Sequence, residues 1–138
     1  MKILVSACLL GDNVKYNGGN NKSSSVLNFI KGHEVMSFCP EILAGFSVPR
    51  KAIEMKGEDL ISVDGENLNE YMTLSLSRID KIIKDFKPDL AILKSRSPSC
   101  GKDKIYDGSF THTLTDKDGY ASKYLKDNNI KVISEEDI

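Results

Sequence analysis

The sequence predicts an α/β fold with a mainly parallel sheet and helices on both faces. Two observations support this prediction. Short apolar segments typical of buried strands alternate along the chain with segments that have the 3.6-residue period of helices. Each short segment also ends at residues that favour loops and turns. Such an alternation is typical of strands that lie side by side and are connected through helices packed on the sheet.

In the first third of the chain, two strands and one helix are expected. A strand is predicted over 2–7 because its short apolar run stops at Gly11-Asp12-Asn13. Serines at 23–25 can cap a helix over about 24–30. A second strand is predicted over 33–38 and ends at Cys39-Pro40.

The remaining elements continue the alternation. The clearest amphipathic helix is predicted over 68–85, with Pro88 marking its end. A third strand follows at 90–94. The next segment, 95–101, is too polar and too rich in Pro and Gly to be anything but a loop. A helix over about 119–128 and a strand over 131–133 complete the pattern.

Composition limits the classes of protein to consider. A chain of 138 residues, with 40% hydrophobic and 28% charged side chains, fits one domain over 1–138. Its 19 basic and 20 acidic residues give no charge excess that would favour nucleic acid or anionic lipid. No apolar run approaches the ~20 residues that span a bilayer. An odd count of three widely spaced cysteines does not suit a disulfide framework, and we expect a cytoplasmic protein.

The three cysteines are the main candidates for chemistry. Cys8, Cys39 and Cys100 each follow a predicted strand. The carboxyl ends of parallel strands meet at one edge of a sheet, so these residues are expected to form one site. Three thiolates suit either a catalytic zinc with water as fourth ligand or an iron–sulfur cluster with one open iron, and spacing does not separate these options. His33 and His112 lie in polar contexts typical of solvated histidines.

Five motifs in order point to a known family. They resemble the signature blocks of the family named domain of unknown function 523, which includes thiouracil desulfidases, and the similarity runs from Lys2 to Glu135. The motifs are Ser6-Ala7-Cys8-Leu9-Leu10-Gly11, Cys39-Pro40-Glu41, Pro49-Arg50, Ser97-Pro98-Ser99-Cys100-Gly101 and Ile105-Tyr106-Asp107-Gly108-Ser109-Phe110.

The resemblance implies a Rossmann-like fold and a [4Fe-4S] cluster held by Cys8, Cys39 and Cys100. One iron would remain open to the sulfur of a thiolated uracil base or nucleotide, and the products would be the oxo-pyrimidine and sulfide, without net redox. The resemblance carries catalytic roles to Glu41 and Ser97. A carboxylate such as Glu41 suits the removal of a proton from the attacking water.

Substrate contacts are expected from Tyr16, Lys22 and Arg50. Lys22 stands just before a predicted helix, where it could pair with a nucleotide phosphate. Arg50 suits a bidentate contact with carboxylate or phosphate. Asp107, within a Tyr-Asp-Gly sequence, is typical of a residue that builds a turn.

Two other functions are compatible with the same residues. The chain could be a cysteine- or zinc-dependent hydrolase, in which one low-pKa thiol acts as nucleophile. It could also be a non-catalytic nucleotide-binding module that cradles phosphate with Gly18-Gly19 and the loop 97–101. Whether the substrate is a base, a nucleotide or RNA is left open, although near-neutral charge argues against large RNA.

Overall fold

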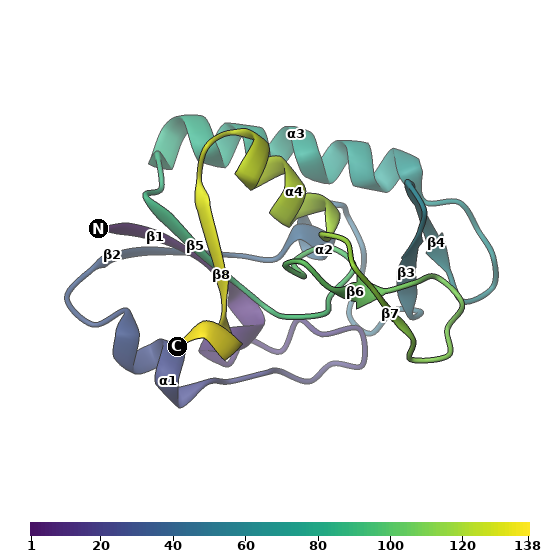
Figure 1. The fold of residues 1–138 in the computed structure, drawn as a ribbon, viewed down its shortest axis with the longest axis horizontal. Helices are drawn as coiled ribbons and strands as arrows, with labels where there is room; N and C mark the ends of the chain where they lie inside the picture. Colours follow the sequence, from purple (N-terminus) through teal and green to yellow (C-terminus); the bar gives the residue numbers. More distant parts are fainter.

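The computed structural model describes all residues, 1–138. Its centre is a parallel sheet with the strand order β2-β1-β5-β8 (Figure 1). The strands are β1 (Lys2–Ser6), β2 (Glu34–Phe38), β5 (Leu90–Leu93) and β8 (Lys131–Ser134). All four were predicted from the sequence, each with one boundary shifted by one residue. The predicted α/β class with a parallel sheet is therefore confirmed.

Helices cover both faces of the sheet, as predicted. On one face lie α3 (Asn69–Phe86) and α4 (Tyr120–Asp127), and on the other lies α1 (Ser24–Phe29) (Figure 1). Successive side chains of a strand point to opposite faces. Within β1, Leu4 accordingly packs in the cluster that contains residues of α3 and α4, whereas Ile3 and Val5 pack with Val26 of α1.

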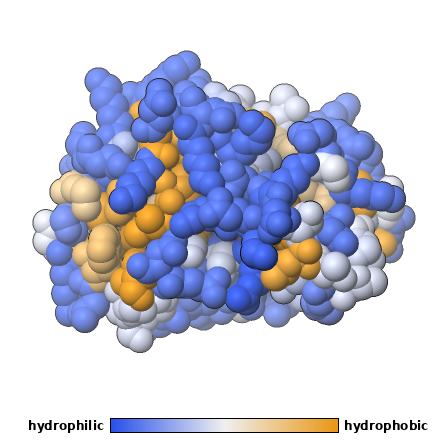
Figure 2. Space-filling view, viewed as in Figure 1, coloured by the Kyte–Doolittle hydropathy of each residue, from blue (hydrophilic) through white to orange (hydrophobic).

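The ends of the helices follow from local chemistry. The Ser23 side chain accepts the Val26 N–H at 3.2 Å and caps the first turn of α1. Helix α3 ends at Lys87, which adopts a left-handed conformation immediately before Pro88. No helix in the chain is both long enough and apolar enough to cross a membrane. Figure 2 shows a mostly hydrophilic face, with hydrophobic atoms gathered over the edge strand β8.

Several elements were not predicted. Two antiparallel hairpins, β3–β4 and β6–β7, lie outside the parallel sheet at one end of the molecule (Figure 1). Short helices also follow three of the sheet strands. The bounds are η1 (Ala7–Leu10), α2 (Pro40–Leu43), β3 (Ile53–Lys56), β4 (Asp59–Ser62), β6 (Ile105–Tyr106), β7 (Leu114–Thr115) and η2 (Glu135–Asp137).

The two hairpins meet where backbone segments approach closely. Gly108 follows β6 with φ +93°, and a Cβ added there would lie 2.6 Å from the Cβ of Lys56 in β3. Only glycine therefore fits this contact. From within β3, the buried carboxylate of Glu54 accepts N–H groups of Gly108 and Phe110 at 3.0 and 3.1 Å. These bonds fix the loop after β6 against β3.

Candidate functional site

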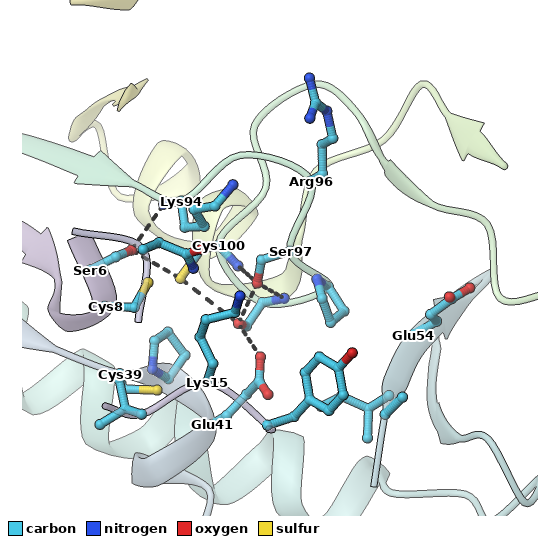
Figure 3. Close-up of a pocket in the computed structure, with 18 of the residues that line it drawn as sticks. Ser6, Cys8, Lys15, Cys39, Glu41, Glu54, Lys94, Arg96, Ser97 and Cys100 are labelled. Carbon is cyan, nitrogen blue, oxygen red and sulfur yellow. Dashed lines mark hydrogen bonds between the residues drawn. The ribbon is translucent and has the colours of Figure 1, made fainter. Parts of the chain in front are cut away.

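The three cysteines line one pocket at the carboxyl edge of the sheet. Cys8 lies in η1 directly after β1, Cys39 is the N-cap of α2 directly after β2, and Cys100 lies in the loop after β5. The pocket has a volume of about 570 Å³, and all three thiols are free of disulfides. Figure 3 shows their side chains directed into the same part of the pocket. The pocket thus brings together the three cysteines that follow sheet strands.

The loop that carries Cys100 is held by hydrogen bonds at both ends. The Ser97 hydroxyl oxygen accepts the N–H groups of Ser99 and Cys100 at 3.2 and 3.0 Å. The first amides of α4 donate to carbonyl oxygens of the same loop, with Gly119 bonded to Gly101 at 2.8 Å and Tyr120 bonded to Pro98 at 3.1 Å. These contacts make the loop a fixed part of the fold.

The turn that carries Cys39 is fixed by a different set of contacts. Pro40 occupies the start of α2, where its missing N–H costs no helical hydrogen bond. The buried Ser75 hydroxyl of α3 donates to the Pro40 carbonyl at 2.6 Å. Glu41 follows in the first turn of α2 and lines the pocket.

Glu41 is the centre of a polar network inside the pocket. Its Oε1 accepts a hydrogen bond from Arg50 Nε at 3.0 Å and forms an ion pair with Arg50 Nη2, also at 3.0 Å. Its Oε2 accepts the Ser99 hydroxyl at 3.0 Å. The side chains of Arg50 and Glu41 are only 7% and 12% exposed, so this is a largely buried ion pair. Ser97 joins the network because its hydroxyl lies 3.0 Å from that of Ser99.

Ser99 is a site residue that the sequence analysis missed. The motif Ser97-Pro98-Ser99-Cys100 contains two serines, and only Ser97 was expected to act. In the structure, Ser99 is the serine that contacts the carboxylate of Glu41 directly. A signal existed in the sequence, since side chains two positions apart within a tight loop can face one polar group.

Burial dominates the electrostatics of the thiols. It raises the pKa of Cys100 far above the usual range, although the Ser6 hydroxyl donates to Cys100 Sγ at 3.2 Å and favours the thiolate. Burial likewise raises the pKa of Cys8 and of Cys39, against opposing hydrogen bonds from Asn21 and from the Ile42 amide. Burial therefore disfavours the thiolate form of all three cysteines.

Two of the three expected substrate contacts line the pocket, and the third does not. Tyr16 lines the pocket and is 47% exposed, and Arg50 also lines it but is committed to Glu41. Lys22 does not line the pocket; its side chain is exposed and its aliphatic carbons pack near Gly11. Asp107 accepts the Ser109 N–H at 2.9 Å and builds a turn, as expected.

Other basic groups line the pocket without having been predicted. Lys94 bridges Glu135 and Ser95 at one wall, with its ammonium 3.0 Å from Glu135. His112, expected to be a solvated histidine, is exposed but lies at the pocket and packs edge-on against Tyr106 with ring centroids 5.7 Å apart. The second histidine, His33, lies away from the pocket beside the N-terminal amine. The remaining pocket cations are Lys15 and Arg96.

The pocket offers donors for a cofactor with several metal atoms. No group of three His, Cys, Asp or Glu side chains has the spacing for a single metal ion. The donor set is instead three thiols distributed around a shared cavity, and the chain has no fourth cysteine. Thiolates are the usual ligands of iron–sulfur clusters. These residues fit a cluster held at three corners.

The fold and the pocket together define the class of this protein. It is an α/β protein whose pocket, at the carboxyl edge of a parallel sheet, is lined by three cysteines. The profile of the 2-thiouracil desulfurase family matches residues 3–137, and the chain belongs to that family. The family expected from the five motifs is thereby confirmed, as is the expected class of enzyme.

Individual relatives agree with this placement. The protein YbbK of Bacillus subtilis (strain 168), described as uncharacterized, is 32% identical over 146 residues, covering 99% of this chain and 97% of YbbK. A solved structure, described as the [4Fe-4S]-dependent thiouracil desulfidase TudS, matches with a TM-score of 0.92 and 31% identity. That match covers 99% of this chain and 92% of the TudS chain.

Proposed function

We propose that this chain is a desulfidase that removes sulfur from a thiolated uracil, using a [4Fe-4S] cluster bound by Cys8, Cys39 and Cys100. The observation that carries the proposal is the pocket itself, in which three free thiols from the segments that follow three strands share one cavity with a largely buried carboxylate. Family membership and the likeness to TudS support the same activity.

The cluster would be held at three corners, because the chain supplies three thiols and no fourth. When bound, it supplies a soft Lewis-acidic iron suited to a thiocarbonyl sulfur. The protein must then provide a site from which bulk water is largely excluded, a positioned water molecule and a proton acceptor. Replacement of C=S by C=O with water yields the oxo-pyrimidine and sulfide, and needs no external oxidant or reductant.

Glu41 is the proposed proton acceptor. Arg50 holds its Oε1 and the Ser99 hydroxyl holds its Oε2, so contacts at both oxygens fix the orientation of the carboxylate. Its Oε2 accepts one hydrogen bond, from Ser99, and retains a second lone pair for a water molecule. A carboxylate in this position contributes typically ~10²–10⁴-fold to the rate by removing a proton.

Ser97 is proposed to act together with Glu41 through Ser99. A hydroxyl has one proton, so a Ser99 that donates to Glu41 can only accept at the contact with Ser97. The Ser97 hydroxyl is therefore the donor in that contact. The three groups form a directed chain, Ser97 to Ser99 to Glu41, whose hydroxyls both point toward the carboxylate and hold it in place as the acceptor of the water proton.

The thiol-hydrolase alternative is less well supported. A nucleophilic cysteine needs a lowered pKa, whereas burial raises the pKa of each cysteine here. Binding to metal removes the thiol proton directly and is compatible with such burial. The three cysteines therefore suit ligation better than nucleophilic attack.

The nucleotide-binding alternative also lacks free donors. Gly18 and Gly19 do not line the pocket. In the loop 97–101, the amides of Ser99 and Cys100 are bonded to Ser97 Oγ, and that of Gly101 is bonded to the Ser97 carbonyl at 2.8 Å. A phosphate cradle requires backbone amides that point at the ligand without internal partners.

The test is anaerobic reconstitution with iron and sulfide, followed by assay of sulfide and uracil formed from 2-thiouracil and from a thiolated uridine nucleotide. Glu41→Gln keeps the shape of the side chain and removes the base, so the variant should retain its cluster and lose most of the activity. A wild-type protein that binds zinc but no cluster would instead favour the hydrolase. Tight nucleotide binding that survives loss of all three cysteines would favour the binding module.

A further inference from the structure

Tyr120 joins two of the cysteine-bearing segments. Its backbone N–H, at the start of α4, donates to the Pro98 carbonyl at 3.1 Å, two residues before Cys100. Its side-chain hydroxyl donates to Ser75 Oγ of α3 at 3.1 Å. Ser75 in turn donates to the Pro40 carbonyl at 2.6 Å, one residue after Cys39.

The whole connection is buried. Tyr120 is 6% exposed and Ser75 is fully buried, so water does not compete for these hydrogen bonds. Burial also raises the pKa of the Tyr120 phenol well above its usual value, and the nearby Glu41, Cys100 and Cys39 add to this effect when charged. The phenol is therefore protonated and remains a donor to Ser75.

No other side-chain hydrogen bonds connect these two segments through α3. The Ser99–Glu41 bond also joins them, but that bond lies in the pocket, where substrate and water enter. The Tyr120 connection lies behind the pocket, in the core formed by α3 and α4. It is therefore placed to hold the spacing of the two segments without touching the reacting atoms.

We propose that Tyr120, acting through Ser75, is a positioning residue that sets the distance between Cys39 and Cys100. This inference rests on the proposed function in so far as these thiols bind a cluster. A shared cofactor needs its ligands at a fixed separation, and an enzyme site is useful only when its geometry is held closely. The Tyr120 hydroxyl supplies that restraint from outside the pocket.

The test variant is Tyr120→Phe, which removes one hydroxyl and retains the ring and the backbone bond to Pro98. Tyr124→Phe is the matched control. Tyr124 lies in the same helix and also bonds α3 through its hydroxyl, to Asp80 Oδ1 at 2.7 Å, but it has no connection to either cysteine segment. Ser75→Ala breaks the same connection from the other side and serves as a second variant.

The primary measurement is the rate at which anaerobic, reconstituted protein loses iron to an excess of chelator, together with the electron paramagnetic resonance spectrum of the reduced cluster. We expect Tyr120→Phe to lose iron about fivefold faster, equivalent to the ~1 kcal/mol of a typical hydrogen bond. Its spectrum should shift, because the ligand geometry changes. Tyr124→Phe should match the wild type in both.

A second measurement uses the metal-free protein and does not depend on the proposed function. The rates at which Cys39 and Cys100 react with iodoacetamide, followed by peptide mass spectrometry, should rise about fivefold in Tyr120→Phe, by the same loss of one hydrogen bond. They should not change in Tyr124→Phe. If the wild type takes up no cluster, the proposed function fails, and this measurement alone decides the role of Tyr120.

Two results would overturn the inference. One is wild-type thiol reactivity in both Tyr120→Phe and Ser75→Ala. The other is an equal rise in Tyr120→Phe and Tyr124→Phe, which would mean that any loosening of α4 from α3 has the same effect.

Discussion

The hydroxyl of Ser99 donates a hydrogen bond to Glu41 Oε2 at 3.0 Å and joins two segments whose residues are 58 positions apart in sequence. One is the loop that follows β5 and carries Cys100, and the other is the helix α2, which follows β2 and has Cys39 as its N-cap. The bond thus connects the proposed base to the segment that holds a proposed ligand. Because Ser99 uses its only proton in this bond, the Ser97 hydroxyl must donate to Ser99.

Replacing Ser99 with alanine should lower kcat while leaving the iron content unchanged. A hydrogen bond to a charged group contributes ~1.5–3 kcal/mol, which corresponds to about a 10- to 100-fold loss of rate. The rate of sulfide release from thiouracil by reconstituted protein measures this loss of kcat. Ser77→Ala is the control, since that hydroxyl bonds only its own helix on an exposed face. Full activity in Ser99→Ala would contradict the role given to the chain of serines.

Arg50→Met should destabilise the protein by ~3–5 kcal/mol, because it leaves Glu41 charged and nearly buried without its partner. Urea unfolding of the metal-free protein measures the loss. Lys81→Met is the matched control, since its ion pair with Asp85 is exposed and worth only ~0.5 kcal/mol or less. Adding Glu41→Gln to Arg50→Met should recover part of the stability. A loss no larger than that of Lys81→Met would show that the pair is not buried in solution.

Glu54→Ala should release the loop after β6. The carboxylate is the acceptor for the amides of Gly108 and Phe110, and each unpaired buried donor costs ~1–3 kcal/mol. We expect faster hydrogen exchange at these two amides and a higher KM, since Phe110 and His112 line the pocket. Glu58→Ala, at an exposed site, is the control. An unchanged rate of hydrogen exchange at the Gly108 amide would refute the role of Glu54 in holding the loop after β6.

The pH dependence of stability should contain a contribution from Glu135. Burial alone would raise the pKa of this carboxyl, but the Ser95 amide and the Lys94 ammonium outweigh it and lower the pKa below 4.5. A group with a lowered pKa in the folded state stabilises the protein above its unfolded pKa, and this contribution is lost as pH falls through the folded value. The wild type should therefore exceed Glu135→Gln in stability at pH 7.

The difference between the wild type and Glu135→Gln should shrink as the pH is lowered below ~4.5, the value for a free glutamate. Urea unfolding of both proteins across that range measures it. A difference that stays constant down to pH ~3 would mean that Glu135 titrates normally, since a lowered pKa requires the loss in that window.

The sequence predicts the sheet and its helices because their patterns arise from burial alone. The run Ile3-Leu4-Val5 and the periodic apolar residues of 68–85 each satisfy one simple rule. The β3–β4 hairpin does not. Its first strand reads Ile53-Glu54-Met55, and all three residues are buried, so the alternation expected of a hairpin strand is absent. Glu54 is buried only because a loop about 54 residues away supplies its partners.

The site was predictable to the extent that it depends on strand ends. Cys8 and Cys39 follow strands directly, and parallel strands bring such residues to one edge. Finer choices depend on turn geometry that the sequence does not reveal. Proximity to a helix suggested Lys22 as a substrate contact, yet its side chain is exposed, packs near Gly11 and does not line the pocket. Ser99 was missed although it lies only two positions from Ser97 in the same loop.

The most direct test of the proposed centre is the iron and sulfide content of anaerobically reconstituted protein, measured for the wild type and for Cys8→Ser, Cys39→Ser and Cys100→Ser. The wild type should hold about four iron and four sulfide per chain, as a [4Fe-4S] cluster requires. Each variant should hold far less and release no sulfide from thiouracil. A full cluster in any one of the three variants, with wild-type sulfide release, would contradict the assignment of these thiols as its ligands.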